Sequence, residues 1–385
     1  MQPCKTVLYF LYSNPCYYPP LEHSARLLAE NGFRVVILGT RGEGPCGFRF
    51  SALHSNIRIR LLAICSPGFR QKLHYARFAV WVFWWTLRLR PRWVYASDTL
   101  ACPIALWLSF LPNVSVVYHE HDSPDAIPVT VINKVLHWCR RNLARRAAAS
   151  VLPSHKRADR FAQATDMQRR PICVLNCPSL AELSARAGHR DDKALQVYFH
   201  GSIVPARVPV ALVRALAGLP ENVRLCIVGY ETRGSAGYVD QLRKLAGELG
   251  VDNRLQFPGT FPTRADLLDV CSRQDVGIAF MPMMAASIDE ETMAGASNKA
   301  FDYLACGLPV LVSDRPEWRT GLVDPGYALS CDSSNPNSIA SALQWFLDHP
   351  DERRRMGKEG RQRILEEWNY ECQFAPVLAI MRGEI

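Results

Sequence analysis

Short apolar runs alternate along the chain with longer segments whose apolar residues recur at helical spacing. In the first half the short runs are residues 7–12, 34–38, 93–96, 114–118 and 150–152. In the second half they are residues 195–199, 224–228, 255–257, 276–279 and 310–312. Runs without polar alternation are typical of strands buried on both faces of a parallel sheet that helices cover. The pattern therefore predicts a doubly wound α/β fold in each half of the chain.

The length of the chain also indicates two domains, because 385 residues exceed what one core usually holds. Residues 176–192 are polar and irregular, and we place the linker there. Two such domains facing each other would leave a cleft at the carboxyl ends of their sheets. Open parallel sheets bind ligands at these ends, so we expect the functional site there.

The segment SNKAFDYLACGLPVLVSD (297–314) predicts a short helix that begins at an anion site. Ser297 is a favourable N-cap, and Gly-Leu-Pro ends the helix before a strand. Free N–H groups and the dipole at a helix start attract anions, and Lys299 would add a positive charge. Asp302 lies three residues on and could accept hydrogen bonds from ribose hydroxyls. The alternative is an ordinary surface Lys–Asp pair.

A second anion site is indicated by LQVYFHGSIVPARVPVALVRAL (195–216), which we interpret as a strand, a turn and a helix. The turn is expected at His200, Gly201 and Ser202, with Arg207 near the start of the helix. Arg207 and Lys299 would then converge on one diphosphate. The alternative is a simple turn with a solvated arginine.

Together these motifs resemble the retaining glycosyltransferases of family 4, which have the GT-B fold of two Rossmann-like domains. The resemblance covers nearly the whole chain, although each motif alone is weak. Its strongest first-half motifs are YYPPLEHSARLLAENGFRVVILG (17–39), PRWVYASDTLACPIALWL (91–108) and VSVVYHEHDSP (114–124). In the second half the matching motifs are YFHGSI, VRLCIVGY, NRLQFPGTFP, DVGIAFMP and SNKAFDYLACGLPVLVSD.

The resemblance also implies the domain boundaries. We expect an N-terminal acceptor-side domain over residues 1–178 and a linker at 179–193. A nucleotide-sugar-binding domain would follow over residues 194–360. The closing helix, residues 361–385, would cross back onto the first domain.

The roles of individual residues follow from the same resemblance. Arg207, Lys299 and His121 are expected to be catalytic: the first two hold the donor diphosphate, and His121 contacts the donor sugar. Asp302 would bind the ribose. The other expected donor-binding residues are Gly201, Ser202, Gly259, Thr260, Phe261, Ser297, Asn298 and Ala300. The expected acceptor-side residues are Tyr18, Pro20 and His119.

The sequence departs from the family pattern at several positions. Ala294 stands where the family usually has the first of two glutamates, and Asp302 stands in place of the second. Ser202 replaces an arginine of the second-domain turn. In the N-terminal loop, Leu21 and Glu22 replace a common Gly-Gly pair.

The implied activity is retaining transfer from a nucleotide-diphosphate sugar to a glycan or lipid-linked acceptor, as in polysaccharide biosynthesis. No cofactor and no metal are expected, because the cations would neutralise the leaving diphosphate. His119 and His121 could alternatively begin a metal cluster, but a third ligand of definite spacing is missing. Two other functions stay open: a non-hydrolysing sugar-nucleotide epimerase and a non-catalytic glycosyltransferase-like subunit.

The formal charge of +9 favours anionic partners. Residues 74–93 combine aromatic residues with arginines, which fits either a helix packed in the core or a patch on an anionic membrane surface. The sequence shows no nucleic-acid-reading module. It has no uninterrupted apolar run of about 20 residues, and its scattered cysteines suggest reduced thiols. We therefore expect a cytoplasmic protein, with peripheral binding at the inner face of the membrane as an option.

Overall fold

The computed structural model describes residues 5–41, 50, 54–63, 65, 68–124, 130–183, 193–285 and 287–384. The chain divides into two compact units. The first unit comprises Met1–Asn176 together with Tyr370–Ile385, and the second comprises Cys177–Asn369. The expected linker, 179–193, lies largely outside the described residues. Its described beginning, the short helix η3 (Leu180–Glu182), belongs to the second unit.

The end of the chain differs from the single helix expected over 361–385. Helix α13 (Pro350–Glu366) belongs to the second unit, and helix α14 (Tyr370–Arg382) belongs to the first. Asn369 explains the break, because its side-chain amide donates to the carbonyls of Ile364 and Leu365 and so satisfies the end of α13. The apolar side of α14 then enters the core beside β1.

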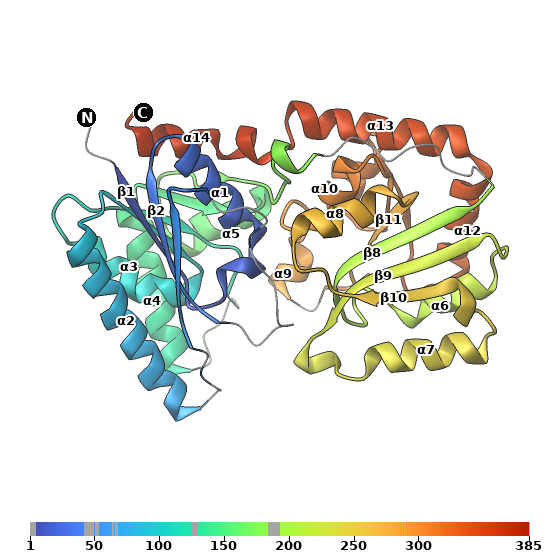
Figure 1. The fold of residues 1–385 in the computed structure, drawn as a ribbon, viewed down its shortest axis with the longest axis horizontal. Helices are drawn as coiled ribbons and strands as arrows, with labels where there is room; N and C mark the ends of the chain where they lie inside the picture. Colours follow the sequence, from blue (N-terminus) through green and yellow to red (C-terminus); the bar gives the residue numbers. More distant parts are fainter. Residues whose placement is uncertain are drawn as a thin grey trace. The chain divides into compact units, whose positions relative to one another are not determined.

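The first unit contains a parallel sheet in the order β3-β2-β1-β4-β5-β6-β7. One face of the sheet is covered by α2, α3, α4 and α5, and the other by α1 and α14 (Figure 1). Its strands are β1 (Thr6–Phe10), β2 (Arg34–Thr40), β3 (Ile57–Leu62), β4 (Trp93–Ser97), β5 (Ser115–His119), β6 (Ala149–Leu152) and β7 (Ile172–Cys173). Its other helices are η1 (Pro15–Tyr17), α1 (Pro19–Glu30), α2 (Phe69–Leu89), η2 (Thr99–Ala101), α3 (Cys102–Leu108), α4 (Val131–Arg146) and α5 (His155–Thr165).

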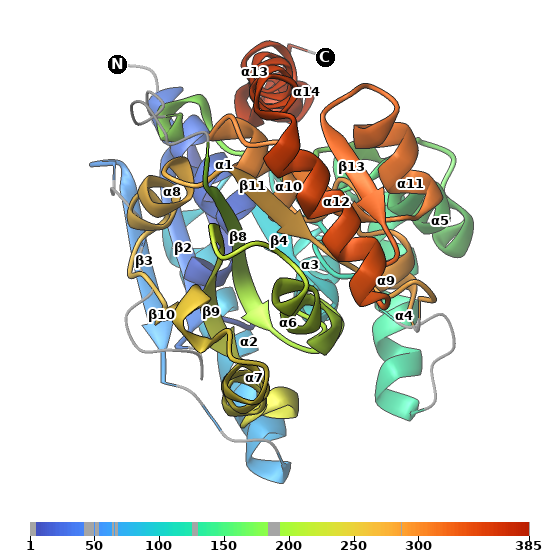
Figure 2. The same cartoon turned by 90° about the vertical axis from the view of Figure 1, so that its right-hand side faces the viewer.

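The second unit contains a parallel sheet in the order β10-β9-β8-β11-β12-β13. Helices α6, α7 and α12 cover one face, and Figure 2 shows α12 beside α6. The strands are β8 (Leu195–Ile203), β9 (Val223–Glu231), β10 (Leu255–Gly259), β11 (Val276–Ala279), β12 (Val310–Ser313) and β13 (Ala328–Cys331). The longer helices are α6 (Val210–Ala217), α7 (Tyr238–Glu248), α8 (Arg264–Ser272), α10 (Asn298–Ala305) and α12 (Pro336–Asp348). The short ones are η4 (Arg233–Ser235), η5 (Asp252–Arg254), α9 (Ile288–Glu291), α11 (Pro316–Trp318) and η6 (Arg319–Val323).

Helix α10 is held tightly between the sheet and α13. A Cβ on Gly277 of β11 would lie 2.2 Å from the ring of Tyr303, and a Cβ on Gly357 of α13 would lie 2.1 Å from the carbonyl oxygen of Gly307. Only glycine permits these approaches. The first turn of α10 is therefore fixed on a rigid base.

All ten expected strands are present, but three further strands were not predicted. These are β3, β7 and β13, and each lies at or beside the edge of its sheet. An edge strand is partly solvated and does not need a continuous apolar run; β3, for example, reads Ile-Arg-Ile-Arg-Leu-Leu. Among the described residues, no helix combines the length and apolar composition needed to cross a bilayer.

Candidate functional site

In the second unit, the expected donor residues gather where the strand order reverses, between β8 and β11. This is where open parallel sheets bind ligands. The backbone around Gly201 differs from the expected turn, because β8 continues through Ser202 to Ile203. Arg207 accordingly lies in the connection after β8, before α6 begins at Val210.

Position 201 requires a glycine because of its backbone conformation and the close approach of its neighbours. Its φ is 120°, and it lies opposite Gly229, whose φ is 151°. A Cβ on Gly229 would lie 1.8 Å from the carbonyl oxygen of Gly201, and a Cβ on Gly201 would lie 2.9 Å from Cε of Lys299. The two glycines therefore let the strands and the Lys299 side chain approach one another closely.

Lys299 lies in the first turn of α10 and is only partly exposed. Its Nζ lies 5.8 Å from the centre of the Phe199 ring. Burial and, to a lesser extent, the charge of Arg207 together lower the pKa of Lys299 to about 7, and the charge of Asp302 opposes the shift. Because two cations share this place, an anion would relieve their repulsion.

The first turn of α10 adds backbone donors beside these two cations. The guanidinium of Arg207 donates to the hydroxyl of Ser202. Ser297 precedes α10. It was expected to cap the helix, but its side chain makes no capping hydrogen bond. The side-chain oxygen of Asn298 is buried and has no hydrogen-bond partner among the described residues. The first-turn amides of α10 thus keep the capacity to bind an anion.

Asp302 has a different environment from the one predicted. It is fully buried, and its two carboxylate oxygens accept from Arg264 at 2.8 and 3.3 Å. Nε2 of His200 lies 3.3 Å from one of the same oxygens. Burial raises the pKa of Asp302, but Arg264 and His200 outweigh it and lower the pKa below its usual value. In this structure the carboxylate accepts from protein partners, and its expected contact with ribose stays a prediction.

Arg264, the partner of Asp302, is a residue that the sequence pattern did not single out. It lies in the first turn of α8, and its guanidinium also donates to both oxygens of Glu182 at 2.8 and 3.1 Å. Glu182, Arg264, Asp302 and His200 therefore form one connected buried network beneath Lys299; we call it the Arg264 network. The partners of Arg264 are 82 and 38 residues away, and no motif links such positions.

The remaining second-unit residues are dispersed around this place. Gly259 ends β10 with a φ of 86°, and the register of β10 against β9 shifts just before it. Thr260 is exposed and Phe261 is half-buried, whereas Ala300 is buried. The residues after β10 are thus at least partly exposed, and their expected role in binding the base stays a prediction.

The first unit carries its own polar cluster at the carboxyl ends of β4 and β5. His119 ends β5, and the rings of His119 and His121 lie 4.0 Å apart. Nδ1 of His119 lies 2.8 Å from the hydroxyl of Tyr95. Both ring nitrogens of His121 are buried without a hydrogen-bond partner among the described residues, and burial lowers its pKa to about 4. His121 is therefore held neutral and can either donate or accept.

Asp98 organises the backbone beside His121. Its carboxylate accepts from the backbone N–H groups of His121 at 2.9 Å and of Asp122 at 3.4 Å. Burial raises the pKa of Asp98 to about 7, although these hydrogen bonds oppose the shift. The ring of Tyr18 lies 5.0 Å from that of His121, and Pro20 is buried in the first turn of α1. Of the expected acceptor-side residues, Tyr18 and His119 thus lie beside His121.

The intervening glutamate of the His-Glu-His-Asp segment is not available as a metal ligand. Glu120 accepts from Arg140 at 2.5 and 2.7 Å and from the hydroxyl of Tyr118 at 2.7 Å. Across the described ranges, no group of three or more His, Cys, Asp or Glu side chains is placed to hold a metal ion.

Comparison with known families matches both units. The model "Glycosyl transferase 4-like domain" matches residues 21–178, and the model "Glycosyl transferases group 1" matches residues 182–363. A D-inositol 3-phosphate glycosyltransferase of Corynebacterium glutamicum is 30% identical over 170 residues. That alignment covers 42% of this chain and 37% of the relative, so the likeness spans well under half of the relative's length.

Two solved structures share the fold over almost the whole chain. Sucrose-phosphate synthase from Thermosynechococcus elongatus superposes with a TM-score of 0.75 at 15% identity, covering 99% of both chains. HepE from Anabaena, solved in complex with UDP, has a TM-score of 0.71 at 16% identity and covers 98% of this chain and 100% of its own. At these identities the likeness establishes the fold alone.

Proposed function

Since the chain belongs to the family-4 type of glycosyltransferases with the GT-B fold, we propose that it transfers a glycosyl group, with retention, from a nucleotide-diphosphate sugar. The proposed acceptor is a glycan or a lipid-linked glycan, in polysaccharide or glycolipid assembly. One observation carries the proposal. Lys299, in the uncapped first turn of α10, lies over Gly201 and is near enough to Arg207 for their charges to repel, and this arrangement suits a diphosphate.

In the proposed reaction, the bond between the anomeric carbon and the diphosphate oxygen breaks, and negative charge develops on the diphosphate. Lys299, Arg207 and the N–H groups at the start of α10 stabilise that charge. The acceptor oxygen forms the new bond to the anomeric carbon from the face that the diphosphate leaves, and its proton passes to a phosphate oxygen. The step needs no separate protein nucleophile, and retention follows from the shared face.

The proposal is tested by calorimetric titration of the protein with UDP, GDP, TDP and ADP in EDTA. UDP is the first choice, because the Anabaena structure contains it. We expect one nucleotide to bind without divalent metal; at a hundred times its Kd it should stabilise the protein by about 2.7 kcal/mol. The corresponding sugar nucleotide should then release nucleoside diphosphate only when an acceptor is present. Binding that is lost in EDTA would contradict the metal-free mechanism.

The affinity for UDP should fall as the pH rises above 7. The pKa of Lys299 is about 7 in the free protein, and a bound diphosphate favours its charged form, so binding takes up a proton. Above pH 7 the affinity should therefore weaken by up to about tenfold per pH unit. Calorimetry at pH 7.5 and 8.5 in buffers of different ionisation enthalpy measures both effects.

The matched control for this pH dependence is Lys299→Arg, which keeps its charge over the whole range. Its UDP affinity should be independent of pH from 7.5 to 8.5. An equal pH dependence in both proteins would assign the titration to another group.

His121→Ala should lower the rate of sugar transfer while leaving UDP affinity unchanged. The reason is that His121 belongs to the first unit, whereas all the proposed diphosphate ligands belong to the second. Loss of its neutral ring should lower the rate of sugar transfer by a factor of about 10² or more, which is the usual contribution of a positioned acid–base side chain. Initial rates of nucleotide release and calorimetric Kd values separate the two effects. A parallel loss of UDP binding would show that the variant disturbs the fold.

A further inference from the structure

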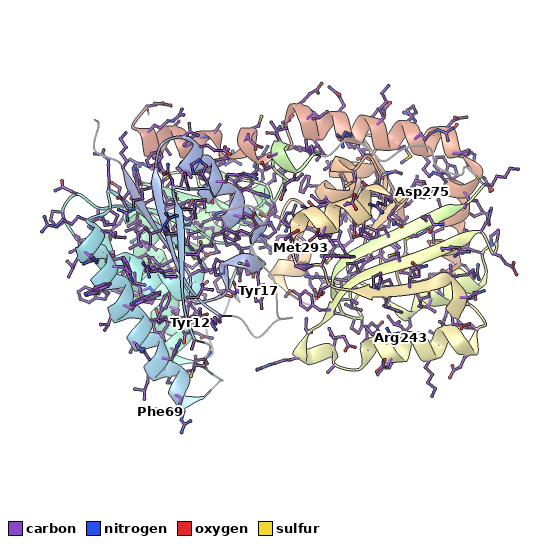
Figure 3. The ribbon with its side chains drawn as sticks, in the orientation of Figure 1. Tyr12, Tyr17, Phe69, Arg243, Asp275 and Met293 are labelled. Carbon is purple, nitrogen blue, oxygen red and sulfur yellow. The ribbon has the colours of Figure 1, made fainter. Side chains whose placement is uncertain are left out.

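Helix α2 presents apolar side chains to solvent along one stripe. Its inner side is buried through Phe78, Val82 and Thr86. The opposite side carries large exposed apolar residues at helical spacing, namely Phe69, Leu73, Val80, Trp84 and Leu87. Phe69 is 74% exposed at the tip of the helix (Figure 3), and Trp84 is 51% exposed. The helix packs in the core, as one interpretation of residues 74–93 expects, and it also displays an apolar stripe to solvent.

The neighbouring helices continue this stripe. Trp107 of α3 is 68% exposed, and Phe110 follows it at the surface. On α4, Trp138 is 62% exposed, and Val131, Ile132 and Val135 are exposed on the turns before it. Helices α2, α3 and α4 cover the same face of the sheet, and α3 contacts both of the others. We call their solvent side the outer face.

The charge of the outer face has one sign. Helices α2, α3 and α4 contain no aspartate or glutamate. The exposed basic residues beside the apolar stripes are Arg70, Lys72, Arg77 and Arg88 on α2, and Lys134, Arg141, Arg145 and Arg146 on α4. Asp166 pairs with Arg141 and Arg145 at the end of α4. No ion pair joins the four basic residues of α2 to a described carboxylate.

From this combination we propose that the outer face binds an anionic lipid surface. Tryptophan and aliphatic side chains can enter the boundary between headgroups and acyl chains, while arginine and lysine extend to the phosphates. A second copy of the chain is a poorer occupant, because two basic faces would oppose each other. The proposal does not depend on the transfer reaction; it would keep the enzyme at a surface that can present a lipid-linked acceptor.

The test is flotation of the full chain with vesicles of phosphatidylcholine alone or with phosphatidylglycerol. We expect binding to the anionic vesicles that weakens with salt. Arg77→Glu with Arg88→Glu should weaken partitioning by about 25-fold or more, since each basic residue contributes a factor of about five. Val80→Ser with Trp84→Ser should weaken it by about tenfold or more.

Matched controls come from the second unit. Leu365 and Arg273 are exposed, so Leu365→Ser and Arg273→Glu should leave flotation unchanged. UDP affinity should be unaltered in all four variants, which separates this proposal from the proposed function. The proposal would be overturned if the outer-face substitutions left the fraction of protein that floats with anionic vesicles unchanged. It would also be overturned if the same fraction floated with neutral vesicles. A dimer in analytical ultracentrifugation that these substitutions dissociate would overturn it too, because the occupant would then be a second copy.

Discussion

Lys299→Ala should lower turnover with the true donor by about a hundredfold to a thousandfold while the protein stays folded. Lys299 belongs to the first turn of α10, and its side chain lies over Gly201 and the Phe199 ring of β8. Because the side chain is partly exposed, its removal leaves no large cavity. Its charge matters most as the diphosphate departs. Turnover should therefore fall more than donor affinity does.

Steady-state rates of nucleotide release, with Kd values from calorimetry, measure this difference. Arg207→Ala should behave similarly, and the double variant should lose less than the sum of the two, because both cations act on one anion. Lys299→Arg should retain much more activity than Lys299→Ala. If Lys299→Ala kept wild-type turnover, the proposal that the diphosphate binds at the start of α10 would be wrong.

Arg264→Met should destabilise the second unit by about 3–5 kcal/mol, because it leaves two carboxylates without their cation. Asp302 is fully buried, and the side chain of Glu182 is only 8% exposed. Each currently accepts two hydrogen bonds from the same guanidinium. Urea denaturation followed by a signal of the second unit measures the loss. UDP binding should weaken as well, since Asp302 and Lys299 share α10.

Two further variants test whether the effect comes from unpaired buried charge. The triple variant Glu182→Gln, Arg264→Met, Asp302→Asn removes all three charges and should recover part of the stability. Arg355→Met breaks an exposed pair with Glu359 on α13 and should cost less than about 1 kcal/mol. If Arg264→Met lowered the free energy of unfolding no more than Arg355→Met does, the Arg264 network would not stabilise the second unit.

Local sequence patterns predicted some features of the proposed site and not others. The residues of the two anion motifs, Gly201, Arg207 and Lys299, come together as their strand and helix positions imply. Local details differ: β8 runs through the expected turn, and Ser297 does not cap α10. Such details depend on a few hydrogen bonds, which a hydrophobic pattern does not encode.

The role expected for Asp302 came from its helical position and from the family resemblance. Residues three apart on a helix lie on neighbouring sides, which suggested that Asp302 would share the ligand with Lys299. In the structure the side chain of Asp302 is turned into the interior, where Arg264 meets it. Which neighbour fills that interior position depends on the packing of α8 against α10, and these helices are far apart in the sequence.

The sequence by itself determined the two parallel sheets, the positions of their buried strands along the chain and the glycine-bordered cation pair. These features rest on periodicity, turn residues and helix ends, which act over a few residues. Only the tertiary structure decided the Arg264 network, the edge strands and the outward direction of the apolar stripe on α2. Each of these depends on which distant segment removes a side chain from water, and burial is a property of the packed chain rather than of its local pattern.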